Sequence, residues 1–204
     1  ALDIGPIGQL MEPSGTLSFD EAYRAAVRQV RAGEKAGADL VIIETIADLY
    51  EMKAAVLAVK ENSSLPIFCT LTYDGNGRTM MGTDPKAAIN VLEGLGVDAL
   101  GANCSLGPRE LLPIVDELLK YAHIPVIIQP NAGLPRLENG KTIFDTDAGE
   151  FAAFGKRMIE KGVRIIGGCC GTTPDFIREL KGSVKDIKIN KSPVKPHRHT
   201  AVSS

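Results

Sequence analysis

The 204-residue sequence lacks the features of several protein classes. No apolar run approaches the roughly 18 residues of a membrane-spanning helix. The net charge is only −2, so the chain has no excess of basic residues for binding nucleic acid or an anionic membrane. No glycine-rich phosphate loop follows the first strand-like run, because "GPIGQL" does not have the spacing of a dinucleotide-binding fingerprint.

Cysteine and histidine are also scarce. The four cysteines, Cys69, Cys104, Cys169 and Cys170, are too few for a disulfide scaffold in a chain of this length. Such sparse cysteine usage predicts a reduced, cytoplasmic compartment. Only three histidines are present, which limits the candidates for acid–base catalysis.

The sequence contains a regular alternation of two kinds of segment. Short, nearly all-apolar runs such as "LVIIE" and "PVIIQ" are typical of strands buried on both faces of a parallel sheet. The runs predicted as strands are Ala1–Gly8, Ala38–Thr45, Pro66–Thr72, Ala99–Ser105, Pro125–Asn131 and Val163–Gly168.

Amphipathic segments between these runs predict helices. Ser18 and Glu21 have the spacing of a capping box, and Asp48 and Glu51 repeat that spacing. Pro85 suits the first turn of a third helix. Further helices are predicted over 107–122, over 147–162 and after Thr173-Pro174.

Repeated strand–helix units favour an α/β fold, either a (β/α)8 TIM-barrel or an open doubly wound sheet. Six units are present and a closed barrel needs eight, so a barrel would be incomplete. The chain starts within a strand-like run, and we therefore expect it to be a piece of a longer protein. From about Gly182 the sequence becomes basic, with two prolines and two histidines, and predicts a linker or tail.

Cysteines gather at the predicted carboxyl ends of the strands, where α/β folds form their active sites. Cys104 ends the fourth strand, and Cys169-Cys170 follow the sixth within "GGCCG". Loops from strands two apart can converge, and glycines allow a turn in which adjacent thiols face one ion. Three thiolates match a zinc site with an open fourth position.

Other interpretations of the cysteines stay open at this point. The adjacent pair could be buried by chance or could form a strained vicinal disulfide. Cys69 lies inside a strand and is predicted to be a small buried apolar residue. His123 precedes its strand and is expected at the opposite face of the sheet.

A sulfur-rich zinc site favours binding of a substrate thiol as a thiolate. No histidine is expected at this end to act as a base, so alkyl transfer to sulfur fits the residues better than hydrolysis does. Glu44 ends the strand "LVIIE" and is either a contact for a substrate ammonium group or a solvated end of the strand.

Three motifs together resemble the homocysteine S-methyltransferase family: "GANCSLGP", "QPNAGLP" and "GGCCGTTPDFI". The segments "DIGPIG" and "IIETIADLYEMKAAV" agree with it. Within the family, "LTYDGNGRTMMGTDP" and the tail "KPHRHTAVSS" are most similar to the homocysteine-binding module of cobalamin-dependent methionine synthases. The resemblance covers about residues 1–181 and then the tail.

The resemblance implies a zinc-dependent (β/α)8 barrel that methylates homocysteine to methionine. By position, Cys104, Cys169 and Cys170 match the zinc ligands. Glu44 matches the residue that holds the substrate amino group, and we list with it two further candidates for substrate binding, Asn103 and Asn131. Methylcobalamin and methyltetrahydrofolate would bind other modules of the same full-length chain. Residues 1–181 would then be the homocysteine-binding zinc barrel, and 182–204 a linker toward a folate-binding domain.

The sequence departs from the family pattern at its start. The first two strand–helix units of the family barrel have no counterpart, and one of them carries a segment that helps to bind substrate. We therefore expect these 204 residues alone to have little or no methyltransferase activity. Uncovered sheet edges would favour self-association.

Two alternatives to this function remain. One belongs to the same family, with S-methylmethionine as the methyl donor or with a fused folate reductase as neighbour. The other is a non-catalytic zinc-binding or thiol-redox domain, in which the cysteine pair stores metal or cycles as a disulfide.

Overall fold

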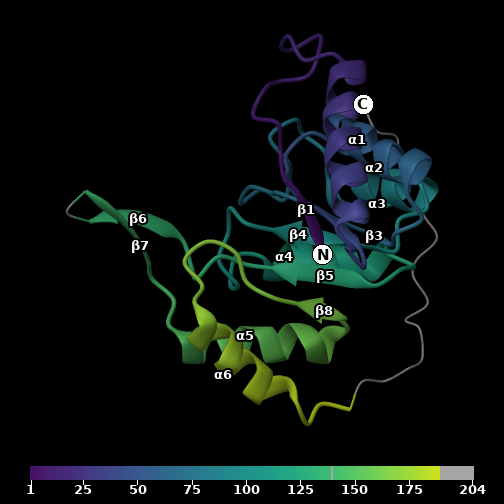
Figure 1. Cartoon of the computed structure of the whole chain (residues 1–204). Helices are drawn as coiled ribbons and strands as arrows, with labels where there is room; N and C mark the ends of the chain where they lie inside the picture. The colour runs from purple at the N-terminus through teal and green to yellow at the C-terminus, as the bar shows by residue number, and fades with distance from the viewer. Residues whose placement is uncertain (139, 189–204) are drawn as a thin grey trace.

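The computed structural model describes residues 1–138 and 140–188, which form an α/β fold around one parallel sheet (Figure 1). Six strands lie in the order β1-β2-β3-β4-β5-β8, and every neighbouring pair is parallel. The strands are β1 (Leu2–Ile4), β2 (Val41–Ile46), β3 (Ile67–Leu71), β4 (Ala99–Asn103), β5 (Val126–Gln129) and β8 (Ile165–Ile166). Each lies within one of the six predicted runs, except that β2 extends one residue beyond its run, to Ile46.

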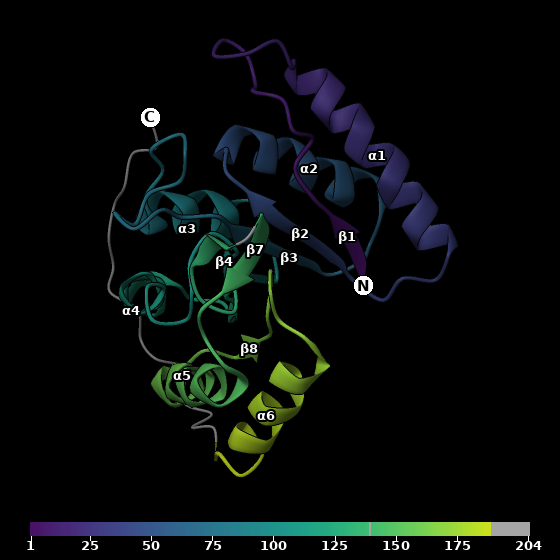
Figure 2. The same cartoon turned by 90° about the vertical axis from the view of Figure 1, so that its left-hand side faces the viewer.

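Six helices alternate with these strands in the described residues. They form an arc around the sheet, with α1 and α6 at its two ends (Figure 2). The helices are α1 (Phe19–Lys35), α2 (Leu49–Asn62), α3 (Pro85–Gly94), α4 (Leu112–Tyr121), α5 (Ala148–Lys161) and α6 (Pro174–Val184). The predicted alternation of strand and helix is confirmed.

The strand order decides between the two predicted architectures. A doubly wound sheet contains a point at which the strand order reverses. Here the order in space follows the order in sequence across all described strands of the sheet, so the doubly wound alternative is wrong. Right-handed crossovers in one constant direction place the helices on one face of the sheet.

Alternating side chains along the strands point to this helical layer, and in β2 and β3 they are buried there. Cys69 is one of them: it is fully buried, and burial raises the pKa of its thiol. The prediction that Cys69 is a packed core residue is confirmed. The opposite face of the sheet carries polar side chains near the carboxyl ends of β2, β4 and β5, where Asn103 pairs in register with Gln129.

The helix starts match the predicted caps in two cases out of three. At α1, the Glu21 amide donates to the Ser18 hydroxyl (3.3 Å) and the Ser18 amide donates to the Glu21 carboxylate (3.1 Å), so the capping box is present. At α3, Asp84 is the cap and Pro85 occupies the first turn. At α2, Asp48 caps alone, because the Glu51 carboxylate bonds elsewhere.

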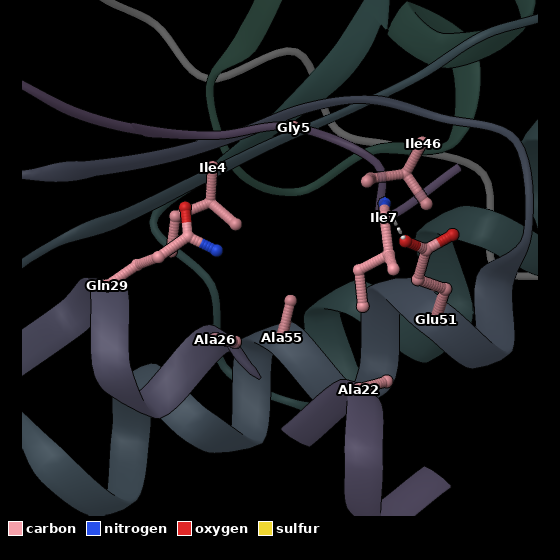
Figure 3. A pocket seen from close by; sticks show the side chains of 9 residues that line it. All are labelled: Ile4, Gly5, Ile7, Ala22, Ala26, Gln29, Ile46, Glu51 and Ala55. Carbon is pink, nitrogen blue, oxygen red and sulfur yellow. Dashed lines mark hydrogen bonds between the residues drawn. The ribbon is translucent and has the colours of Figure 1, made fainter. Parts of the chain in front are cut away.

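Glu51 holds the segment that follows β1. Its carboxylate accepts a hydrogen bond from the Ile7 amide at 2.7 Å, across a small cavity between α1, α2 and this segment (Figure 3). The side chain is only 7% exposed, and burial raises the pKa of the Glu51 carboxyl. A predicted capping contact is thus replaced by a long-range bond that anchors a loop at the carboxyl end of the sheet.

The variant Glu51→Gln is expected to be at least as stable as the wild type at pH 8. Because the folded-state pKa of Glu51 lies above the roughly 4.3 of an unfolded chain, the wild type loses stability as the pH rises through this range. Glutamine does not titrate, and its amide oxygen can still accept from Ile7. Urea unfolding at pH 4 and pH 8 measures the stability of the variant relative to the wild type, and this stability advantage should be smaller at pH 4. A variant whose relative stability falls between pH 4 and pH 8 would contradict this account.

A two-stranded antiparallel hairpin between β5 and α5 was not predicted. Its strands β6 (Pro135–Glu138) and β7 (Lys141–Phe144) project away from the sheet (Figure 1). Their side chains are exposed or partly exposed, so no apolar run marked them. The Asn-Gly dipeptide between them in the sequence is a typical hairpin signal that could have revealed them.

The end of the folded part lies slightly beyond the expected position. Helix α6 continues past Gly182 to Val184, and the Ser183 hydroxyl donates to the Ala152 carbonyl at 3.2 Å. The tail histidines His197 and His199 lie outside the described residues. No helix in the described ranges is long and apolar enough to cross a membrane.

Candidate metal centre

Three cysteine thiols meet at the carboxyl end of the sheet. Cys104 directly follows β4, and Cys169 and Cys170 lie in the loop after β8. Their sulfur atoms all lie within 4.8 Å of one another, and the Cys104 and Cys170 sulfurs are 3.8 Å apart. Since β4 and β8 are separated by β5 alone, the loops of strands two apart converge as the sequence predicted.

In the cysteine loops at the carboxyl end of the sheet, the backbone adopts left-handed conformations that residues other than glycine rarely adopt. Cys104 and Ser105 have positive φ angles of 60° and 58°. In the second loop the Cys169 carbonyl accepts from the Thr172 hydroxyl (2.7 Å), and Gly171 has a φ of 80°. A Cβ at Gly171 would also lie 2.3 Å from the Phe144 ring. This glycine therefore serves both the turn and the packing of the hairpin against it.

The thiols are coupled electrostatically. Hydrogen bonding, chiefly from Cys169, lowers the pKa of the Cys104 thiol to about 5. The same bond and burial raise the pKa of Cys169, while burial chiefly raises that of Cys170. Two of these cysteines are partly buried and Cys170 is exposed, and a set of three sulfur donors suits a soft divalent cation.

Asn103 lies fully buried beneath these sulfurs. Its amide oxygen accepts from the Thr45 amide (2.8 Å) and the Thr70 hydroxyl (2.7 Å). Its amide nitrogen donates to the Thr45 hydroxyl (2.7 Å) and approaches the Cys169 sulfur at 3.8 Å. All the hydrogen-bonding capacity of this amide is used within the protein. Thr45, which it holds, has a positive φ of 65°.

Asn131 supports the cysteine loop from β5. It is 3% exposed, and its amide oxygen accepts from the Cys170 amide at 3.1 Å. Its backbone amide donates to the Leu106 carbonyl at 3.0 Å, in the loop that carries Cys104, and its side chain helps to lower the pKa of the Cys104 thiol. Asn131 therefore contacts both cysteine loops.

Glu44 lies at the carboxyl end of β2 and is half-buried. Its carboxylate accepts a hydrogen bond from the Gln129 side chain at 3.3 Å. Burial, followed by the negative charge of Asp3, raises the pKa of the Glu44 carboxyl. Sequence reasoning chose Glu44 as a site candidate but not its neighbours Gln129 and Thr45, although both stand near the carboxyl ends of predicted strands.

His123 lies away from this site, as predicted. It precedes β5, at the amino end of the sheet, and its ring nitrogen pairs with Glu93 at 2.9 Å. It is the one histidine among the described residues. No imidazole base is therefore present near the cysteines in the described part of the chain.

The chain matches a known family over most of its length. A family model described as homocysteine S-methyltransferase matches residues 1–184. The chain belongs to the homocysteine S-methyltransferase family. The resemblance inferred from the three sequence motifs is thus confirmed.

Relatives in this family include two methionine synthases. The chain is 40% identical over 154 residues to the enzyme of Mycobacterium leprae and 39% identical over 174 residues to that of Mycobacterium tuberculosis. These matches cover 72% and 82% of this chain. The chain spans only 13% and 14% of the two relatives' lengths.

A solved family structure has a similar fold. The apo form of the homocysteine methyltransferase MmuM from Escherichia coli superposes with a TM-score of 0.72 at 25% identity, covering 89% of this chain and 60% of MmuM. The metallated form of MmuM superposes with a TM-score of 0.69, covering 82% and 52%.

Proposed function

We propose that this chain transfers a methyl group to the thiolate of L-homocysteine in a zinc-dependent reaction, as the homocysteine-binding module of a cobalamin-dependent methionine synthase. The observation that carries the proposal is the convergence of Cys104, Cys169 and Cys170 at the carboxyl end of the sheet. The family membership and the identity to methionine synthases support it.

Zinc fits this set of donors. Three cysteine sulfurs within 4.8 Å of one another leave a tetrahedral zinc ion one open position. Cys104, Cys169 and Cys170 would hold the ion, and bound zinc would keep the substrate thiol ionised near neutral pH. The relative MmuM also has a metallated form, but the assignment of zinc to this chain rests on the three cysteines.

The remaining polar residues divide into two roles. Glu44 would hold the substrate ammonium group, since its half-buried carboxylate has one weak hydrogen bond and a repelling neighbour in Asp3. Asn131 would lie beside the substrate while supporting both cysteine loops. Asn103 was first considered a substrate contact. We assign it instead to positioning Thr45 and Cys169, because its amide is buried and fully bonded.

The methyl donor would come from outside these residues. Methylcobalamin would supply the methyl group and methyltetrahydrofolate would regenerate it, each bound by other modules of a longer chain, as the 13% coverage of the methionine synthase relative suggests. Residues 1–181 would form the homocysteine-binding domain and 182–204 a linker to a folate-binding domain. S-methylmethionine remains the alternative donor.

We also propose that the sheet is part of a (β/α)8 barrel. All six strands are parallel and consecutive, and the helices form an arc around them (Figure 2). The candidate site lies at the carboxyl end of the strands, where barrel enzymes place their chemistry.

The test is calorimetric titration of zinc-loaded and zinc-free protein with L-homocysteine. We expect binding by the zinc-loaded form alone, and we expect Glu44→Gln to weaken it about tenfold by removing the charge that faces the ammonium. Glu179→Gln, an exposed glutamate of α6, is the matched control and should bind like the wild type. Equal binding with and without zinc would contradict the proposal.

The same preparation tests the thiol-redox alternative. A redox pair would retain no zinc and would lose two thiols on mild oxidation, measured by thiol titration. A zinc-binding domain without catalytic function would bind the metal but not homocysteine. Because these 204 residues alone are expected to have little or no activity, the donor is identified in a longer chain that also carries the missing strand–helix units, by methionine formation from methylcobalamin or from S-methylmethionine.

A further inference from the structure

Gln129 links the cysteine cluster of the candidate site to Glu44. Its backbone carbonyl accepts a hydrogen bond from the Cys104 amide at 3.1 Å, beside the cysteine cluster. Its side chain donates to the Glu44 carboxylate at 3.3 Å, across 85 residues of sequence. Within the described residues, it is the one hydrogen-bond donor to Glu44.

We propose that Gln129 is a specificity-determining residue that positions the Glu44 carboxylate for an α-ammonium group, so that the site selects amino-acid thiols over thiols without an amino group. This inference rests on the proposed function, since it assumes that a thiol substrate binds at the cysteines. Gln129 was not among the residues that the sequence singled out.

The orientation of the Gln129 amide follows from its partner. A carboxylate oxygen only accepts hydrogen bonds, so the Gln129 atom that faces Glu44 must be the nitrogen. The amide oxygen then points away from Glu44. That oxygen is buried and has no hydrogen-bond partner in the described structure.

An unpaired buried carbonyl lowers the stability of a fold, so this glutamine is a poor choice for packing alone. The side chain lies beside Gly167, where an added Cβ would be in ordinary contact with its Cγ at 3.4 Å. An apolar side chain of similar length, such as methionine, would fill the same space without an unpaired oxygen. The contact that a methionine could not make is the one to Glu44.

Glu44 needs such a partner because its other neighbours repel it. Asp3 lies near it and carries a like charge, and Glu44 is also partly buried. A donor from Gln129 favours the ionised carboxylate and limits its rotation. An arriving ammonium would then meet a charged and oriented acceptor, whereas a thiol lacking the amine would gain nothing from it.

The experiment compares Gln129→Met with the wild type and with Gln29→Met, an exposed glutamine of α1 that serves as the matched control. Zinc-loaded proteins are titrated calorimetrically with L-homocysteine and with 4-mercaptobutanoate, which has the same thiol and carboxylate but no amine. We expect Gln129→Met to weaken L-homocysteine binding about tenfold and to change 4-mercaptobutanoate binding less than twofold. Its zinc content and its stability toward urea should equal or exceed those of the wild type.

Any other result contradicts either the role proposed for Gln129 or the proposed function. Equal losses for both thiols, or no loss for either, overturn the role of Gln129 while leaving the proposed function intact. A less stable Gln129→Met protein would show that the glutamine is needed for packing, and this also overturns the inference. If the zinc-loaded wild type binds neither thiol, the proposed function fails and the inference fails with it.

Discussion

Replacing any one of Cys104, Cys169 and Cys170 with alanine is expected to lower the affinity for zinc by ~10²–10⁴-fold. Structural zinc sites gain roughly 10–16 kcal/mol from about four ligands, so the loss of one thiolate removes about a quarter to a third of that free energy. The expectation is similar for all three cysteines because their sulfurs lie within 4.8 Å of one another and would share one ion. Competition with a chelator of known affinity measures it.

Cys69→Ala is the matched control for these variants. The Cys69 thiol is fully buried within β3 and belongs to the core, not to the cluster. Its loss should cost some stability through the small cavity left behind, but zinc affinity should remain within about twofold of the wild type. If any of the three cluster variants retains tight, stoichiometric zinc, the three-thiolate site is wrong.

Asn103→Ala is expected to destabilise the protein by about 3 kcal/mol or more. The truncation leaves the Thr45 amide and the Thr45 and Thr70 hydroxyls without their buried partner, and each such group costs roughly 1–3 kcal/mol. For a chain of this size the melting temperature should fall by roughly 6–12 °C. Unfolding in the presence of a chelator measures this loss without a contribution from bound metal.

The same variant should weaken homocysteine binding, because Thr45 directly follows Glu44 and would lose the contacts that hold its backbone at a φ of 65°. Asn76→Ala, in an exposed loop after β3, is the matched control and should change stability by less than about 0.5 kcal/mol. A loss under 1 kcal/mol for Asn103→Ala would show that the buried network has no structural role.

Much of the fold was predictable because runs of apolar residues in the sequence indicate which segments are buried. The nearly all-apolar runs that became β2 and β5 could be recognised without any partner, since buried parallel strands have few polar positions. The hairpin of β6 and β7 was not predicted, because its side chains are exposed or partly exposed and form no apolar run. Glu51 was assigned to the wrong partner because a capping box is a local motif, whereas its actual bond reaches Ile7, 44 residues away.

The sequence by itself determined which donor groups this chain offers to a metal ion, namely the thiols of Cys104, Cys169 and Cys170. Cysteines at strand ends keep their donor type wherever the backbone places them, and the motifs around them identified the family. Tertiary structure alone decided which side chains support that chemistry. Gln129 meets Glu44, and Asn103 meets Thr45, only because the register of several parallel strands sets their side chains at one level. Hydrogen bonds between distant residues depend on that shared geometry, which no local pattern encodes.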